Sequence, residues 1–207
     1  MKGQRAASAG LPPWFNIVAA FLGWSLIAPL LGLIALLIRM DSPGPAVFRQ
    51  SRIGKDGKPF TMYKFRTMRR DPAGAKGADY EAPVDFQTFI FTPDSRNPRV
   101  TRIGEMLRRT SLDEMLQLIN VALGDMAIVG PRPEIPEIVR QYPPKYHVRH
   151  RTPPGITGLA QVRGRADLTY AETIRYDLGY VKRRSPRLDL AILARTVSVV
   201  LRGTGAR

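Results

Sequence analysis

Residues 14–38 read WFNIVAAFLGWSLIAPLLGLIALLI, the one uninterrupted apolar stretch of the chain. Among these twenty-five residues only Asn16 and Ser25 carry polar side chains, and none is charged. As an α-helix the stretch would be ~37 Å long, which exceeds the roughly 30 Å hydrocarbon core of a bilayer. The sequence therefore predicts a membrane helix.

Two features of this stretch favour a re-entrant helix over a straight span. Pro29 removes a backbone hydrogen bond and bends the helix at the Ala28-Pro29 break, which leaves the Ser25 carbonyl in need of another partner. Both flanks are basic, with Lys2 before the stretch and Arg39 after it. A spanning helix concentrates positive charge on the cytoplasmic side only. The re-entrant path is our prediction, and the straight span is the alternative.

Composition limits the function classes. The 207 residues carry a net charge of +15, which calls for an anionic partner: nucleic acid, phospholipid headgroups or a phosphorylated substrate. An apolar anchor favours the last two. With no cysteine, the chain forms no disulfide and uses neither thiolate metal ligands nor thiol catalysis. We predict a polar tail at 1–13, the membrane helix at 14–40 and one domain at 41–207.

A β-hairpin is expected soon after the anchor. Residues 46–50 and 60–65 are predicted to form short strands, and the turn-forming segment 54–59 lies between them. Lys64 and Arg66 open a basic cluster after the second strand, suited either to lipid headgroups or to a phosphate of the substrate. Residues 71–97, rich in Pro and Gly, are predicted to form a loop excursion.

The run from 108 to 114, RRTSLDE, is the most informative part of the domain. Ser111 and Glu114 have the spacing of a capping box at the start of a helix with an apolar face. In one interpretation Glu114 only caps Ser111 and Asp113 only complements the helix dipole. In the other, the two carboxylates are catalytic.

Two later segments are suited to phosphate binding. Arg132 stands between Pro131 and Pro133, which fixes its direction and suits bidentate contact with a phosphate, although a solvated arginine in a rigid turn is the alternative. The glycine-rich segment 153–158 is followed by Gln161 and Arg165, a plausible diphosphate cradle that is weak evidence by itself. Residues 188–201 form an amphipathic helix, either interfacial or part of the core.

Seven motifs, in this order, resemble those of the monotopic phosphoglycosyl transferases, the bacterial sugar transferases that start lipid-linked glycan assembly. They are 41–45 (DSPGP), 63–68 (YKFRTM), 107–114 (LRRTSLDE), 130–134 (GPRPE), 155–161 (GITGLAQ), 163–165 (RGR) and 176–181 (YDLGYV). The resemblance covers nearly everything from the anchor to about residue 201, and the length is similar to that of the minimal form.

The resemblance implies an α/β fold: a single re-entrant membrane helix plus a compact catalytic domain of mixed helices and short strands, with interfacial amphipathic helices. It also implies an enzyme that transfers a sugar-1-phosphate from a UDP-sugar to a membrane polyprenol phosphate. The reaction would pass through a covalent aspartyl-phosphosugar intermediate, release UMP and require Mg2+. The bacterial inner membrane, on its cytoplasmic face, is the implied location.

The site residues follow from the matched motifs. Asp113 and Glu114 match the catalytic pair, which is also expected to hold the metal, while Arg132 and Arg165 match arginines of the family. With Lys64, Arg66 and Gln161, these arginines are the predicted substrate-binding residues. One departure concerns the membrane break, where Ala28 stands in place of the usual serine. The serine hydroxyl that could cover free backbone groups at the break is therefore absent at that position.

The expected partners are the UDP-sugar, the polyprenol phosphate and the bilayer, with downstream glycosyltransferases or a homodimer as further candidates. Two other classes stay open on composition: a membrane-tethered nucleic-acid-binding protein, suggested only by the charge, and a non-catalytic membrane scaffold. Aromatic residues are sparse near the basic runs, which disfavours stacking on single strands, so no nucleic acid is expected.

Overall fold

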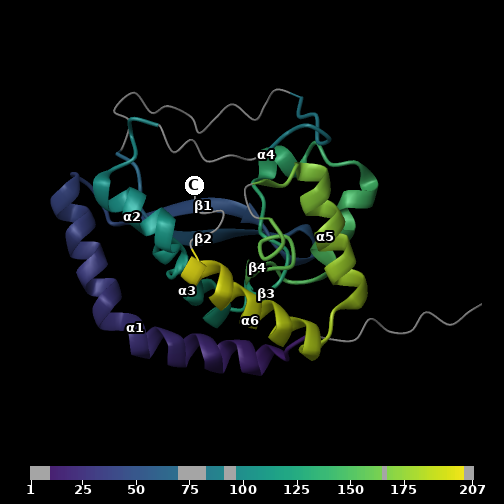
Figure 1. Ribbon diagram of the computed structural model, residues 1–207, viewed down its shortest axis with the longest axis horizontal. Coiled ribbons are helices and arrows are strands. Elements are labelled where there is room, and N and C mark those ends of the chain that lie inside the picture. Colours follow the sequence, from purple (N-terminus) through teal and green to yellow (C-terminus); the bar gives the residue numbers. More distant parts are fainter. Residues whose placement is uncertain (1–9, 70–82, 91–96, 165–166, 203–207) are drawn as a thin grey trace, which may run out of the picture.

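A computed structural model describes residues 10–69, 83–90, 97–164 and 167–202 (Figure 1). Its elements follow one another in the order α1 (Pro13–Asp41), β1 (Val47–Ile53), η1 (Lys55–Gly57), β2 (Pro59–Phe65), α2 (Arg102–Thr110), η2 (Leu112–Glu114), α3 (Gln117–Ala122), β3 (Ala127–Val129), α4 (Pro136–Val139), η3 (Pro144–Arg151), β4 (Gly155–Thr157), α5 (Tyr170–Arg183) and α6 (Pro186–Arg202). The predicted combination of one long apolar helix with a domain of helices and short strands is confirmed.

Helix α1 is a single helix that continues through Pro29 and changes direction about midway (Figure 1). By length and composition it is the one helix in the described part of the chain that could cross a membrane. Its outer face leaves large apolar side chains exposed, among them Phe21, Leu26 and Met40. The re-entrant path stays a prediction, because a bend alone does not place the two ends relative to a bilayer.

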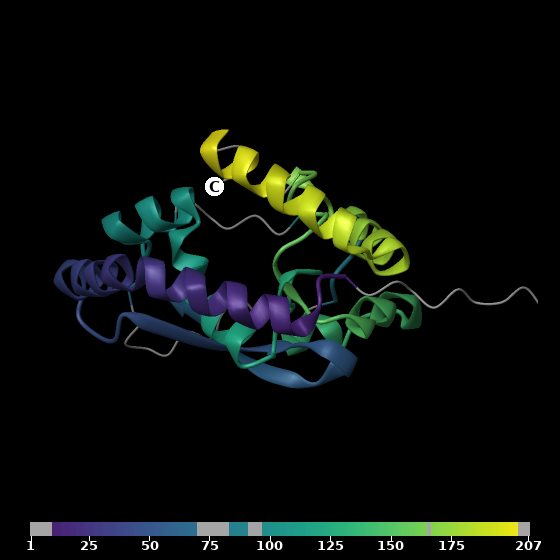
Figure 2. The ribbon, with the colours of Figure 1, turned by 90° about the horizontal axis from the view of Figure 1, so that it is seen from below.

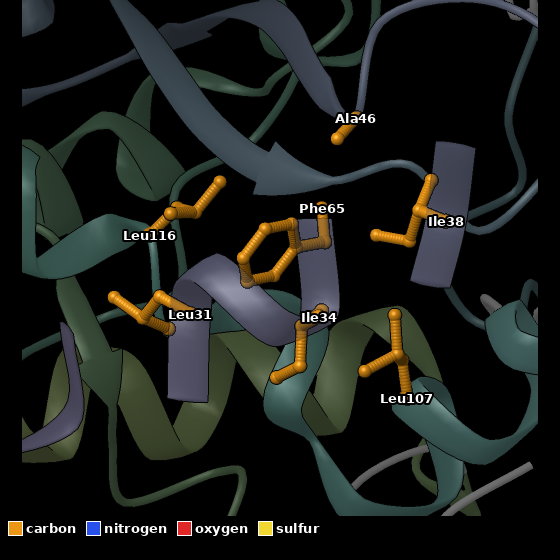
Figure 3. Close-up of a cluster of buried hydrophobic side chains, with 7 residues drawn as sticks. All are labelled: Leu31, Ile34, Ile38, Ala46, Phe65, Leu107 and Leu116. Atoms are coloured by element: carbon orange, nitrogen blue, oxygen red, sulfur yellow. The ribbon is translucent and has the colours of Figure 1, made fainter. Parts of the chain in front are cut away.

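Both halves of α1 also pack against the rest of the protein. In the second half, Leu31, Ile34 and Ile38 belong to a buried cluster with Phe65 of β2 and Leu107 of α2 (Figure 3). In the first half, Ala20 is fully buried and belongs to a cluster with Val121 of α3 and Met126, just before β3. The same helix therefore presents one apolar face outward and contributes another to the core.

The predicted hairpin is confirmed, and its strands are longer than expected. Strands β1 and β2 pair antiparallel from Val47 opposite Phe65 to Ile53 opposite Pro59. The turn between them contains Asp56 at φ 56° and Gly57 at φ 75°. A second, parallel sheet joins β3 to β4.

The predicted capping box is wrong. Ser111 ends α2 in the left-handed conformation, at φ 58°, and its side chain caps neither α2 nor η2. The next turn, Leu112–Glu114, is a 3-10 turn rather than the first turn of a long helix, and α3 begins only at Gln117. The physical reason is that the Glu114 carboxylate has stronger partners: it pairs with two cations instead of a backbone N–H.

Helix α6 is amphipathic, as predicted. Ile192 is buried in a cluster with Val129 and Tyr180, while Leu190 and Val197 are exposed on the opposite face. Figure 2 shows α6 and the first half of α1 on the same side of the molecule. An interfacial role for α6 stays a prediction. Of the predicted loop 71–97, only 83–90 and residue 97 are described; Phe86 there contacts Tyr142 and Tyr170.

Candidate active site

Two cationic side chains from separate parts of the chain meet at Glu114. Lys64 Nζ on β2 lies 2.9 Å from Glu114 Oε1. Arg132, in the segment after β3, donates from Nη2 to the same oxygen at 2.7 Å and from Nη1 to Oε2 at 3.4 Å. Lys64 and Glu114 are largely buried, whereas 43% of the Arg132 side chain is exposed. Arg132 therefore closes the cluster on its solvent side.

The cluster has one more positive than negative charge before Asp113 is counted. Burial by itself would raise the pKa of Glu114, but the charges and hydrogen bonds of Arg132 and Lys64 hold it well below its usual range. Glu114 in turn raises the pKa of Arg132. Burial lowers the pKa of Lys64, and the charge of Glu114 opposes this shift. Glu114 thus stays ionised and is occupied as a counter-ion.

Asp113 differs from its neighbour. In the described part of the chain its carboxylate has no hydrogen-bond partner. Burial, followed by the charge of Glu114, raises the pKa of Asp113 to about 6, against the attraction of Lys64 and Arg132. At neutral pH it is therefore mostly ionised, partly desolvated and not tied to a cation, which are the properties of an available nucleophile.

Local backbone geometry places the two carboxylates. Ser111, a residue with a side chain, occupies the left-handed region that such residues rarely adopt. Its N–H donates to the Arg108 carbonyl at 3.2 Å, and its own carbonyl accepts from the Glu114 N–H at 3.3 Å. This reversal ends α2 and starts η2, so that Asp113 and Glu114 sit on a short, sharply turned segment between two helices.

Arg108 is a site residue that the sequence analysis did not select. Its charge interacts with Asp113. Its Nε donates to Thr67 Oγ1 at 3.0 Å, whereas its buried Nη1 has no partner among the described residues. The available signal was its position five residues before Asp113 in the same run. A buried donor of this kind is suited to an anionic ligand.

Two of the other predicted substrate-binding residues, Arg66 and Arg165, are not seen at Glu114. Arg66 lies away from Glu114, at the end of α1, where its Nη2 donates to the Ser42 carbonyl at 2.7 Å and its Nη1 to the Pro43 carbonyl. It closes the turn after the apolar helix. Arg165 lies outside the described residues. The structure thus brings Lys64 and Arg132 to the site and places Arg66 elsewhere.

Gln161 lines a cleft that reaches Glu114. The cleft measures about 450 Å³, counting space open to solvent. Its walls come from η2, β4 and the last turns of α6, namely Ser111, Glu114, Met115, Ile156, Thr157, Gln161, Val162, Thr196, Val199 and Val200. Gln161 donates from Nε2 to the Ile156 carbonyl at 2.9 Å. A mainly apolar cleft thus lies between Glu114 and the last turns of α6.

The predicted metal ligands fit Mg2+ only with help from a substrate. No group of three or more candidate ligand side chains occurs among the described residues. Mg2+ is commonly held by one or two carboxylates together with substrate phosphates and water. The Asp113 carboxylate, which has no hydrogen-bond partner in the described part of the chain and stands beside Glu114, matches that mode of binding.

The chain matches one family model and several relatives. The model described as bacterial sugar transferase matches residues 8–203. The UDP-glucose:undecaprenyl-phosphate glucose-1-phosphate transferase of Escherichia coli K12 is 40% identical over 190 residues, which are 88% of this chain and 38% of that protein. The exopolysaccharide production protein PSS of Rhizobium leguminosarum is 40% identical over 203 residues, 92% of this chain and 96% of that protein.

A third relative is named for a different sugar. The UDP-N-acetylgalactosamine-undecaprenyl-phosphate N-acetylgalactosaminephosphotransferase of Aeromonas hydrophila is 38% identical over 199 residues, 93% of this chain and 44% of that protein. The chain thus spans less than half of the Escherichia coli and Aeromonas relatives, and nearly all of the Rhizobium one.

Proposed function

This chain belongs to the bacterial sugar transferase family, and on that basis we propose that it transfers a sugar-1-phosphate from a UDP-sugar to a membrane polyprenol phosphate. The observation that carries the proposal is the contrast between Asp113, whose carboxylate has no hydrogen-bond partner in the described part of the chain, and Glu114, which is bound by two cations. The two cations are those of Lys64 and Arg132. The names of two relatives include both a UDP-sugar and undecaprenyl phosphate.

The proposed chemistry has two displacements at one phosphorus atom. A carboxylate oxygen of Asp113 attacks the phosphate next to the sugar, and the bond from that phosphorus to the bridging diphosphate oxygen breaks, so that UMP leaves. An oxygen of the polyprenol phosphate then attacks the same phosphorus. The bond to Asp113 breaks, which regenerates the carboxylate and yields a polyprenyl diphosphate sugar.

Cationic side chains stabilise the charge that moves in both steps. Arg132 is half-exposed, so one of its N–H groups can turn from Glu114 toward the diphosphate of the donor. Arg108, whose charge interacts with Asp113, offers a buried N–H donor. Asp113 and Glu114 would hold Mg2+ together with the donor phosphates; when bound, the ion neutralises negative charge on those phosphates. Glu114 also keeps Lys64 and Arg132 in place.

The exposed apolar surfaces support association with a membrane. We propose that this is the bacterial inner membrane and that the protein binds its cytoplasmic face. Large apolar residues are exposed on α1 and on α6. The first half of α1 and α6 lie on the same side of the molecule (Figure 2). Both halves of α1 bury side chains against the domain, which favours a helix that enters and leaves on one face. A soluble donor and a lipid acceptor would then meet at the interface.

Trapping the intermediate tests this proposal. The protein in detergent, given a UDP-sugar and Mg2+ without lipid, should gain one phosphosugar mass on the peptide that contains Asp113. A panel of UDP-sugars identifies the donor through UMP release. A nucleic-acid-binding protein or a scaffold would release no UMP with any of them. UMP that appears only with polyprenol phosphate, and never with an adduct, would favour direct transfer instead.

A further inference from the structure

A chain of six polar side chains lies behind the turn that carries Arg132. In order of contact, its members are Asp177, Arg149, Tyr142, Tyr170, Glu134 and Arg52. They come from α5, η3, the segments flanking α4 and strand β1. None of these six residues was selected from the sequence as part of the site.

Arg149 is the centre of this chain. Its side chain is 3% exposed and its Nη2 lies 2.6 Å from Asp177 Oδ2. The same Nη2 donates to the backbone carbonyl of Arg132 at 2.7 Å, while Nη1 donates to the Tyr142 hydroxyl. One guanidinium group thus holds a residue of α5, a tyrosine after α4 and the backbone of the Arg132 turn.

The other end of the chain of contacts binds the next carbonyl of the same turn. Tyr142 and Tyr170 share a hydrogen bond, and the Tyr170 hydroxyl donates to Glu134 Oε2 at 2.9 Å. Glu134 Oε1 accepts from Arg52 Nη1 at 3.2 Å, and this Nη1 also donates to the Pro133 carbonyl at 3.2 Å. Arg52 therefore binds the backbone carbonyl of Pro133, just as Arg149 binds that of Arg132.

Three successive carbonyls of the turn are each bound by a different element. The Pro131 carbonyl accepts from the Gly155 N–H of β4 at 2.9 Å. The next two accept from Arg149 and Arg52. Two of the three residues are prolines, which have fixed φ angles and no N–H. The backbone around Arg132 is thus constrained on three sides, and its side chain extends from that frame to Glu114.

We propose that Arg149 is a positioning residue for the donor: it fixes the Arg132 backbone, so that the Arg132 guanidinium is held on Glu114 and facing the UDP-sugar diphosphate. The inference rests on the proposed function. A buried ion pair is weak evidence for a gain in stability, since desolvation offsets most of the attraction. A fork of donors that serves three acceptors in three directions is, by contrast, a property that lysine lacks. Misplacement of a binding group by about 1 Å can reduce rates ~100-fold.

A double-mutant cycle tests the proposal. Arg149→Lys keeps the positive charge beside Asp177 but loses the second arm. We expect its kcat/KM for the UDP-sugar to fall at least tenfold, with the KM for polyprenol phosphate unchanged. In an Arg132→Ala background the same change should cost less than twofold, because the contact through which Arg149 acts is already absent.

Tyr180→Phe is the matched control for lost buried hydrogen bonds. Tyr180 is on α5, as Asp177 is, and its hydroxyl contacts Asp189 and the Val129 carbonyl, outside the 131–134 turn. Its variant should lower the Tm and leave kcat/KM for the donor within twofold. Arg52→Lys, on the other side of the turn, repeats the test should Arg149→Lys fail to fold.

The results distinguish a failure of the positioning role from a failure of the proposed function. Equal losses from Arg149→Lys with and without Arg132, or an unchanged donor kcat/KM in folded Arg149→Lys, would overturn the positioning role while the transferase stands. If Arg149→Lys does not fold, an unchanged donor kcat/KM in Arg52→Lys would overturn it. A loss that Tyr180→Phe reproduces at the same drop in Tm would also overturn it. Wild-type protein that releases no UMP from any UDP-sugar would overturn the proposed function, and this inference with it.

Discussion

The side-chain oxygen of Asn16, inside the apolar helix α1, accepts a hydrogen bond of 2.9 Å from the backbone N–H of Ile128 on β3. Its Nδ2 donates to the carbonyls of Leu11 and Pro12, at the start of the same helix. Asn16, a polar residue within the apolar stretch, therefore links the first half of α1 to strand β3 by a hydrogen bond.

Asn16→Leu should loosen this link. The substitution preserves bulk but leaves the Ile128 N–H buried without its acceptor, which costs about 1–3 kcal/mol. We expect a lower free energy of unfolding in detergent micelles, measured by urea titration. Leu26→Ala, which changes a side chain that is 83% exposed on the same helix, is the control and should change the unfolding free energy little. Equal effects of the two would contradict the link.

Asp113→Asn should abolish turnover and leave the fold intact, since the amide has the same volume and is a poor nucleophile. Mass spectrometry should detect no phosphosugar on the peptide that contains residue 113, and UMP release should fall to background. A Tm within about 2 °C of wild type, which corresponds to at most about 1 kcal/mol, would exclude unfolding as the cause. Residual turnover above a tenth of wild type would remove Asp113 from the role of nucleophile.

Arg132→Ala should weaken use of the donor. A lost charge-assisted contact with phosphate is worth ~1.5–3 kcal/mol, so kcat/KM for the UDP-sugar should fall roughly 10- to 150-fold. Arg140→Ala is the matched control, because Arg140 is exposed and pairs only with the exposed Glu137 among the described residues. Steady-state UMP release measures both. Unchanged kinetics in Arg132→Ala would mean that the donor phosphates bind elsewhere.

The protein should lose stability as the pH falls below about 6.5, because folded His150 resists protonation. Burial, then the charges of Arg149 and His147, lower the pKa of His150 to about 4 from the ordinary value near 6.5. A depressed folded-state pKa means that the unfolded chain binds the proton more tightly. The contribution of neutral His150 to stability is therefore fully present above about pH 6.5 and is lost as the pH falls toward 4. His150→Asn should flatten this part of the Tm-versus-pH curve, and an equal slope in both proteins would contradict the assignment.

Cysteine labelling tests the path of α1, helped by the absence of native cysteine. Single cysteines at Ser8 and at Lys55, an exposed residue of the hairpin turn, should react from the same side of sealed vesicles. Pro29→Ala restores a helical hydrogen bond and should give a mixed population, since a straight helix would carry Lys2 and Arg5 across the membrane. Labelling of Ser8 and Lys55 from opposite sides in the otherwise unmutated chain would end the re-entrant interpretation.

Local sequence patterns predicted the structure correctly where the residues in them have a single common structural role. Two short strand-like runs around the turn-forming segment 54–59 predicted the hairpin, because glycine and proline at such a turn let neighbouring strands pair antiparallel. The Ser111–Glu114 spacing misled for the converse reason. A glutamate at that spacing suits both a cap and an ion pair, and only the approach of Lys64 and Arg132 decides between them.

The sequence by itself determined the long apolar helix, the hairpin, the acidic pair and the rigid Pro-Arg-Pro turn, since each depends on neighbours within a few residues. Only the tertiary structure decided that Arg66 closes the turn after α1 and that Arg149 and Arg52 hold the backbone at residues 132 and 133. An arginine can donate to any carbonyl within reach, and those carbonyls lie 17 or more residues away along the chain. Which of them it meets depends on how the helices and strands pack, and no local pattern encodes it.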